Sequence, residues 1–164
     1  MTKILFRIIL SAALINQTAC LQEAEDANSC YSEKFTAKEM VFTKLLDKPH
    51  FKGGHDSLVT FLSRNIDEEQ IIENLHRNNR TYTDTARVKF IVNQQGGISQ
   101  LSIQTTEQSD FSDELTRVIK KSSCNWVAGG AEQPTDSWYQ FDVYYSIEKH
   151  TGDDVKTTMI INEI

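Results

Sequence analysis

The chain has 164 residues, of which 39% are hydrophobic and 24% are charged, and its net charge is −6 at pH 7. This length and composition predict one domain with short extensions and exclude a collagenous, coiled-coil or wholly disordered chain. Lys120-Lys121 is the only basic doublet that stands out. Nucleic acid is therefore not expected as a partner, because binding phosphates requires clustered lysine and arginine.

Residues 1–19 are predicted to form a secretory signal peptide. Lys3 and Arg7 make a basic start, and Ile8–Ile15 is an apolar run interrupted only by Ser11. The apolar run is too short to cross a bilayer, which takes roughly 20 residues. A buried N-terminal helix is the alternative. Cleavage after residue 19 would remove both basic residues and no acidic one, which changes the net charge from −6 to −8.

Cys20 is the predicted site of lipid attachment. It follows Thr18-Ala19, which resembles the end of a bacterial lipobox, although Gln17 stands where an aliphatic residue is usual. Plain cleavage near Ala19 is the alternative. Residues 20–39 would form a lipid anchor and a polar tether, which predicts a periplasmic location with attachment to a membrane. Several acyl chains on one residue anchor a protein firmly, whereas a single chain holds it only marginally.

The remaining two cysteines, Cys30 and Cys124, are candidates for a disulfide bond. Export would place them in a compartment where disulfides persist. Two free thiols, with Cys124 buried beside Trp126, are the alternative.

Two helices are predicted between Asp56 and Asn78. Asp56 is a good N-cap candidate for the first helix, whose apolar residues lie three or four positions apart: Leu58, Phe61, Leu62 and Ile66. Asp67, with Gln70 three residues later, resembles a capping box that begins the second helix. The buried stripe of that second helix would be Ile71, Ile72 and Leu75.

Three strands are predicted, over residues 87–93, 98–103 and 139–147. Gly96-Gly97 is a hairpin signal between the first two. The third has the clearest alternation, with apolar or aromatic residues at the odd positions Tyr139, Phe141, Val143, Tyr145 and Ile147. We expect Tyr139 and Tyr145 in the core and Tyr144 at the surface.

A third helix is predicted between the second and third strands, with the apolar stripe Phe111, Leu115, Val118 and Ile119. Trp126 follows this helix and is expected to fill the core. Met40–Phe42 would either form a first strand or lead into the domain. Met159–Ile161 could add an edge strand, although we expect the domain to cover residues 40–149 and residues 150–164 to be a C-terminal extension.

These pieces, in this order, resemble the C-terminal domain of TonB-type energy transducers. The resemblance begins at Pro49-His50-Phe51-Lys52-Gly53-Gly54, a P-x-F-x-G-G pattern, and continues through the Val-x-Phe strand, the hairpin and the third helix to Trp126. The order of the predicted helices and strands indicates an α+β two-layer sandwich, and the resemblance implies the same fold, with a three-stranded antiparallel sheet and helices on one face. Relatives usually have Tyr-Pro after the first helix, where this chain has Asn65-Ile66-Asp67.

The resemblance also implies a non-enzymatic protein-binding module of the bacterial cell envelope. Family members add a strand of the partner to the edge of their sheet. By that analogy the last strand would be the docking edge, with partner contacts from Trp138, Gln140, Asp142, Tyr144 and Ser146. The implied partners are envelope proteins, including segments of TonB-dependent outer-membrane receptors, and a homodimer through edge pairing is a further expectation. The alternative is an accessory or structural envelope lipoprotein that keeps the fold without energy coupling.

No catalytic, metal or cofactor site is expected. The histidines, at positions 50, 55, 76 and 150, are scattered, and no Cys-x-x-Cys occurs. His55-Asp56-Ser57 contains the residue types of a catalytic triad, but adjacent side chains point in different directions and would not form the relay.

Overall fold

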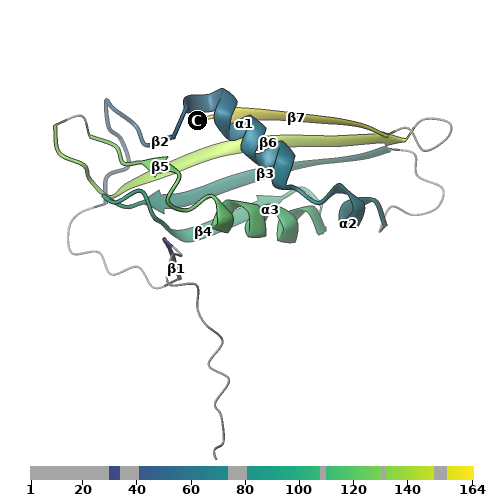
Figure 1. The fold of residues 1–164 in the computed structure, drawn as a ribbon, viewed down its shortest axis with the longest axis horizontal. Helices are drawn as coiled ribbons and strands as arrows, with labels where there is room; N and C mark the ends of the chain where they lie inside the picture. The colour runs from purple at the N-terminus through teal and green to yellow at the C-terminus, as the bar shows by residue number, and fades with distance from the viewer. Residues whose placement is uncertain (1–29, 34–40, 74–80, 108–109, 131, 150–154) are drawn as a thin grey trace, which may run out of the picture.

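The computed structural model describes residues 30–33, 41–73, 81–107, 110–130, 132–149 and 155–164. They form one large sheet, one small sheet and three helices (Figure 1). The helices are α1 (Gly54–Asn65), α2 (Glu68–Glu73) and α3 (Asp110–Lys121). The strands are β1 (Tyr31–Ser32), β2 (His50–Phe51), β3 (Thr81–Val92), β4 (Ile98–Thr105), β5 (Trp126–Val127), β6 (Ser137–Lys149) and β7 (Val155–Glu163).

The large sheet has five strands in the order β1-β4-β3-β6-β7, and β2 pairs with β5 separately. All neighbours in the large sheet are antiparallel except β1 and β4. The three helices lie on one face of this sheet, with α1 and α3 side by side (Figure 1). The α+β class and the two layers are as expected, but a three-stranded sheet was wrong. The two additional strands, β1 and β7, lie at its edges.

The hairpin between β3 and β4 forms where Gly96-Gly97 predicted it. Asn93 closes the turn, because its side-chain Oδ1 accepts hydrogen bonds from the N–H groups of Gln95 and Gly97. Gly96 has φ 81°, and a Cβ there would collide with the backbone carbonyl of Trp126. Only glycine fits both the backbone conformation and the close approach.

Aromatic rings around Trp126 form the core at one end of the sheet. The Trp126 ring lies 4.9 Å from the rings of Phe90 and Tyr139 and 5.4 Å from that of Phe51. Its indole N–H donates to Ser122 Oγ at 3.0 Å, so the buried polar atom is satisfied. Trp126 is 1% exposed, which confirms its predicted place in the core.

The start of α1 differs from the prediction. Gly53, with φ 87°, is the N-cap residue, and Asp56 lies in the first turn of the helix. A carboxylate in the first turn still favours the helix, because it faces the positive end of the helix dipole. For α2 the N-cap is confirmed, because Asp67 Oδ1 accepts from the backbone N–H groups of Glu69 and Gln70 at 3.1 and 3.4 Å. The other half of the predicted capping box differs, because the N–H of Asp67 donates to the Glu114 carboxylate at 2.6 Å.

Candidate binding surface at the β7 edge

The strand expected to be the docking edge lies inside the sheet. β6 pairs with β3 on one side and with β7 on the other, from Phe141 to Lys149. A strand whose backbone is paired on both sides cannot accept a partner strand along that length. The docking edge inferred for β6 was therefore wrong, because residues 155–163 form β7 and cover it.

The five residues expected to contact a partner lie on the sheet face opposite the helices: Trp138, Gln140, Asp142, Tyr144 and Ser146. Their register neighbours on β3 are Ile91, Lys89, Arg87, Thr85 and Thr83. Tyr144 is the most exposed of the five, at 37%, and Ile160 beside it on β7 is 48% exposed. The core positions of Tyr139 and Tyr145 and the surface position of Tyr144 are confirmed.

Cross-strand contacts hold several of these side chains. Arg87 donates two hydrogen bonds to the Asp142 carboxylate, at 2.9 and 3.0 Å. The hydrogen bond and charge of Arg87 lower the pKa of Asp142. The Lys89 ammonium lies 4.4 Å from the centre of the Trp138 ring. These contacts stabilise the outer face of the sheet, so the residues that make them contribute to the fold whether or not a partner binds.

β7 is the outermost strand of the sheet on its side, within the described residues. The backbone N–H of Ile164 donates to the carbonyl of Gln140, in register with the β6–β7 ladder. Hydrogen-bonded pairs alternate along an antiparallel ladder. The even-numbered residues of β7 therefore bond to β6, and the N–H and C=O groups of the odd-numbered residues point away from the sheet.

The opposite edge of the sheet is less open. β1 pairs with Ile98 and Ser99 of β4, and Gln100 adopts a positive φ of 50° where the β3–β4 register shifts. Bulges and short covering strands are common means of blocking a sheet edge. β7 has neither proline nor glycine, and its charged residues are limited to Lys156 and Glu163. Its edge is therefore the better site for strand addition.

A pocket lies beside the start of β6, where the segment at Phe42 and the end of the chain at Ile164 contact neighbouring positions of that strand. Phe42 accepts a backbone hydrogen bond from Trp138, at 2.9 Å, and Ile164 bonds to Gln140. Between these two contacts the segment 42–49 and the end of β7 enclose a pocket of about 500 Å³. Tyr139 forms part of its wall. Burial raises the pKa of Tyr139, and Glu163 raises it further, so its hydroxyl stays protonated.

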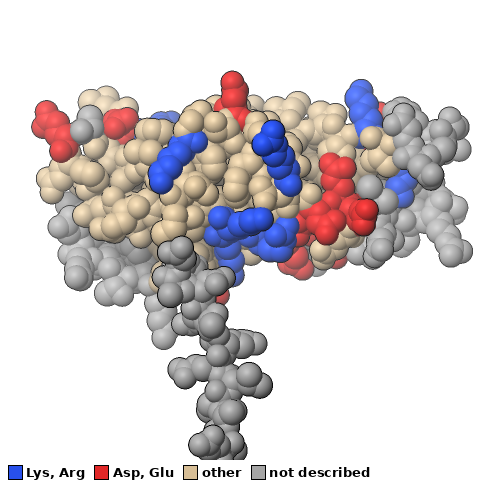
Figure 2. All heavy atoms as spheres, in the orientation of Figure 1, with Lys and Arg blue, Asp and Glu red and all other residues tan. Residues whose placement is uncertain are grey.

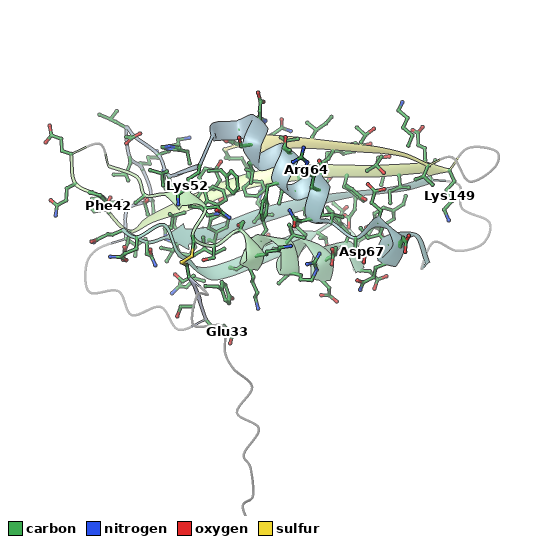
Figure 3. All side chains as sticks on the ribbon, in the orientation of Figure 1. Glu33, Phe42, Lys52, Arg64, Asp67 and Lys149 are labelled. Carbon is green, nitrogen blue, oxygen red and sulfur yellow. A yellow bond between two sulfur atoms is a disulfide. The ribbon has the colours of Figure 1, made fainter. Side chains whose placement is uncertain are left out.

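A disulfide joins Cys30 to Cys124, with their Cα atoms 5.4 Å apart, which is the pairing considered from the sequence (Figure 3). It holds β1 against the start of β4. Lys120 adds to this attachment, since its ammonium lies 4.7 Å from the Tyr31 ring centre and 3.6 Å from Glu33. Cys20, the predicted lipid site, lies outside the described residues.

The structure brings together no catalytic constellation from the His55-Asp56-Ser57 sequence. Ser57 Oγ donates to the backbone carbonyl of Gly53 at 3.0 Å, and His55 Nδ1 lies 3.4 Å from the Glu163 carboxylate. Among the described residues, no group of three His, Cys, Asp or Glu side chains is placed to hold a metal ion. None of the described helices is long and apolar enough to span a membrane.

The pocket was not found from the sequence, and β7 was anticipated only in part, as an edge strand that Met159–Ile161 could add. The signal for the strand was present, because Val155, Met159 and Ile161 occupy alternate positions of residues 155–163, and the last two contact the core. The pocket had no comparable signal, since its walls come from segments about 90 residues apart.

No protein-family model matches this chain, and neither the curated proteins nor the solved structures gave a match. The likeness to TonB-type C-terminal domains thus rests on the order of the residues and motifs in the sequence.

Proposed function

We propose that this chain is a non-enzymatic protein-binding module of the bacterial cell envelope, similar to the C-terminal domains of TonB-type transducers. It docks an extended segment of a partner by adding that segment to β7. The observation that carries this proposal is the outward direction of the odd-numbered N–H and C=O groups of β7. Main-chain hydrogen bonds would supply affinity, and neighbouring side chains would supply selectivity.

The envelope location is supported by two features. The disulfide between Cys30 and Cys124 is stable in an oxidising compartment such as the periplasm. The basic start and apolar run of residues 1–19 have the pattern of a signal peptide. With lipid on Cys20, the domain would be tethered to a membrane through residues 20–39.

The position of β7 favours a second candidate function. The strand that corresponds to the family's docking edge is covered by β7 in this chain. A domain altered at that edge would serve as an accessory or structural envelope lipoprotein that keeps the fold without energy coupling. Its edge would then pair with an envelope-structure protein or with β7 of a second copy.

Hydrogen exchange with the full chain tests strand addition. The probes are peptides from the N-terminal segments of TonB-dependent outer-membrane receptors, added at concentrations up to about a millimolar. We expect the amides of Thr157, Met159 and Ile161 to exchange rapidly in the free protein and to become protected when a peptide binds. Protection confined to β4, or no binding by any peptide, would contradict docking at β7 by receptor segments.

A matched pair of variants separates the backbone from the side chains. Thr157→Pro removes an N–H that points away from β6, so the sheet should persist while peptide binding is lost. Thr158→Ala changes a side chain on the outer face and keeps every backbone donor, so binding should persist. Circular dichroism of both variants would verify folding. Concentration-dependent sedimentation without peptide would reveal pairing between two copies instead.

A further inference from the structure

The pocket between segment 42–49 and the end of β7 has a fixed frame. Phe42 is held by backbone hydrogen bonds to Asp136 and Trp138, at 3.0 and 2.9 Å. The N–H of Gly130 donates to the carbonyl of Asp47 at 3.0 Å, and a Cβ on Gly129 would collide with Leu45 and Asp47. The segment is therefore anchored at both ends. Figure 3 shows Phe42 at the end of the molecule where β2 and β5 lie.

Two kinds of side chain line this pocket. The apolar wall is formed by Phe42, Leu45, Pro49, Trp138 and Ile164. The charged lining residues are Lys44, Lys48 and Lys89, and no aspartate or glutamate lines the pocket in the described part of the chain. Three cations around an apolar cavity are notable in a chain whose net charge is −6.

Two of the three lysines contact residues of the apolar wall. The Lys48 ammonium donates to the backbone carbonyl of Ile164 at 3.3 Å, and the Lys89 ammonium lies over the Trp138 ring. All three lysines are exposed, so their charged ends remain solvated and able to meet an anion. Their stems extend the apolar surface, which gives the pocket an apolar interior and a cationic rim.

We propose that this pocket binds a single-chain amphiphile with an anionic head, its acyl chain against Trp138 and Leu45 and its head between the lysines. The volume of about 500 Å³ lies in the range of small-ligand sites, which are mostly apolar with a few polar groups that fix orientation. Burial of the chain supplies affinity, and charge-assisted hydrogen bonds select a carboxylate or a phosphate. This site is independent of strand addition at β7.

Calorimetric titration of the full chain with three probes of equal chain length tests the assignment. The probes are dodecanoate, dodecanol and dodecyltrimethylammonium, each below its micelle-forming concentration. We expect saturable one-to-one binding of dodecanoate, binding of dodecanol that is about tenfold weaker, and no saturable binding of the cation. Equal binding of all three probes, or no binding of dodecanoate, would overturn the proposal. Lysophosphatidic acid and inorganic phosphate then distinguish a lipid headgroup from a free anion.

Matched lysine variants locate the site. Lys44→Met and Lys89→Met keep the length of the side chain and remove its charge, and each should weaken dodecanoate binding about threefold while leaving dodecanol binding unchanged. Lys156→Met, on β7 outside the pocket lining, should leave both affinities as in the original chain. Tryptophan fluorescence should change on binding and should lose that change in Trp138→Phe. Unchanged dodecanoate affinity in both pocket variants would place the ligand elsewhere and refute the assignment.

Discussion

At the residue scale, two buried carboxylates each hold a nearby loop in place. Asp84 Oδ1, on β3, accepts from the N–H and the hydroxyl of Thr106 at 3.1 and 2.6 Å and from the N–H of Glu107 at 3.2 Å. Glu114, on α3, accepts from the N–H of Asp67 at 2.6 Å and from Arg117 Nε at 2.8 Å. Each carboxylate thereby fixes a chain segment that lies just outside a helix or strand.

Replacing Glu114 should expose its contribution and the dependence of that contribution on pH. The carboxylate is 2% exposed, and the hydrogen bond from Arg117 is the main cause of its lowered pKa. Its stabilising effect is complete above the unfolded-state pKa, near 4.3, and is lost as the pH falls through the lower folded-state pKa. We expect Glu114→Gln to lower the free energy of unfolding by about 1–3 kcal/mol at pH 7.

Urea unfolding at pH 7 and at pH 3 measures this effect. The difference between the original chain and Glu114→Gln should shrink at pH 3, because the pH then lies below the unfolded-state pKa and part of the stabilising effect of the carboxylate is lost. Glu132→Gln, a matched change at an exposed carboxylate, should alter stability by less than about 0.5 kcal/mol at either pH. An equal difference in the free energy of unfolding at the two pH values would show that the charge on Glu114 does not stabilise the fold.

At the element scale, β7 decides which edge of the sheet is open. Met159 and Ile161 pack on the core, and Ser63 of α1 lies 3.8 Å from the sulfur of Met159. The other row of β7 side chains faces away from the helices and includes the exposed Ile160. One strand thus completes the core, covers β6 and presents a new edge, which makes it part of the domain rather than an appendage.

Ending the chain at Lys149 should test whether β7 belongs to the folding unit. The shortened chain loses the burial of Ile161 and uncovers the backbone of β6. We expect the free energy of unfolding to fall by at least about 2–5 kcal/mol, the cost typical of deleting one large buried aliphatic side chain. We also expect self-association, because β6 becomes a long open edge.

Thermal unfolding and sedimentation of the shortened and full chains measure both effects. Ile160→Ala provides the control, since that side chain is 48% exposed and on the outer face. It should leave stability nearly unchanged. If the chain ending at Lys149 were monomeric and as stable as the full chain, residues 150–164 would be an extension after all.

At the scale of the whole molecule, the fold joins distant segments and separates charges. The disulfide links residues 94 positions apart and attaches β1 to the first residues of β4, directly after the hairpin turn. On the helix face, basic side chains gather over the C-terminal half of α3 and acidic ones over α2 (Figure 2). β1, from which the chain leads toward the predicted lipid anchor, lies at the edge of the sheet opposite β7. Its attachment there leaves the β7 edge accessible.

Loss of the disulfide should weaken the whole domain. Closing a loop of 94 residues stabilises the folded state by roughly 4 kcal/mol in the chain-entropy model. The double variant Cys30→Ser with Cys124→Ser should therefore unfold at a lower urea concentration by a corresponding amount. The original chain treated with a reductant should match the double variant, and reductant should not change the double variant further. A mass gain of two hydrogens on reduction would verify the bond, and equal stability with and without it would contradict the prediction.

The helices and the central strands were predictable because each has its own periodic pattern. Phe111, Leu115 and Val118 have helical spacing, and the odd positions from Tyr139 to Ile147 alternate as a half-buried strand does, so local sequence identified both elements. Trp126, which follows the third helix, was correctly expected in the core. The start of α1 was misplaced because Asp56 is a good capping residue, yet Gly53 reaches the left-handed conformation that the tight turn requires.

The candidate binding surfaces depend on contacts between distant residues. The edge of β7 exists because residues 155–163 pair with β6 rather than extend away, and the pocket exists because Phe42 and Ile164 meet the same strand at neighbouring positions. Neither relation appears in a local pattern, since strand pairing is a choice among partners far apart in the chain.

The amino-acid sequence by itself determined the α+β class, the helices, the central hairpin and the core position of Trp126, because periodicity and turn chemistry act over a few residues. Only the tertiary structure decided the number of strands, the pairing of Cys30 with Cys124, the open edge at β7 and the lysine-rimmed pocket. Those features arise when segments tens of residues apart compete for the same hydrogen bonds and the same apolar surface, and the outcome of that competition is set by the packed molecule as a whole.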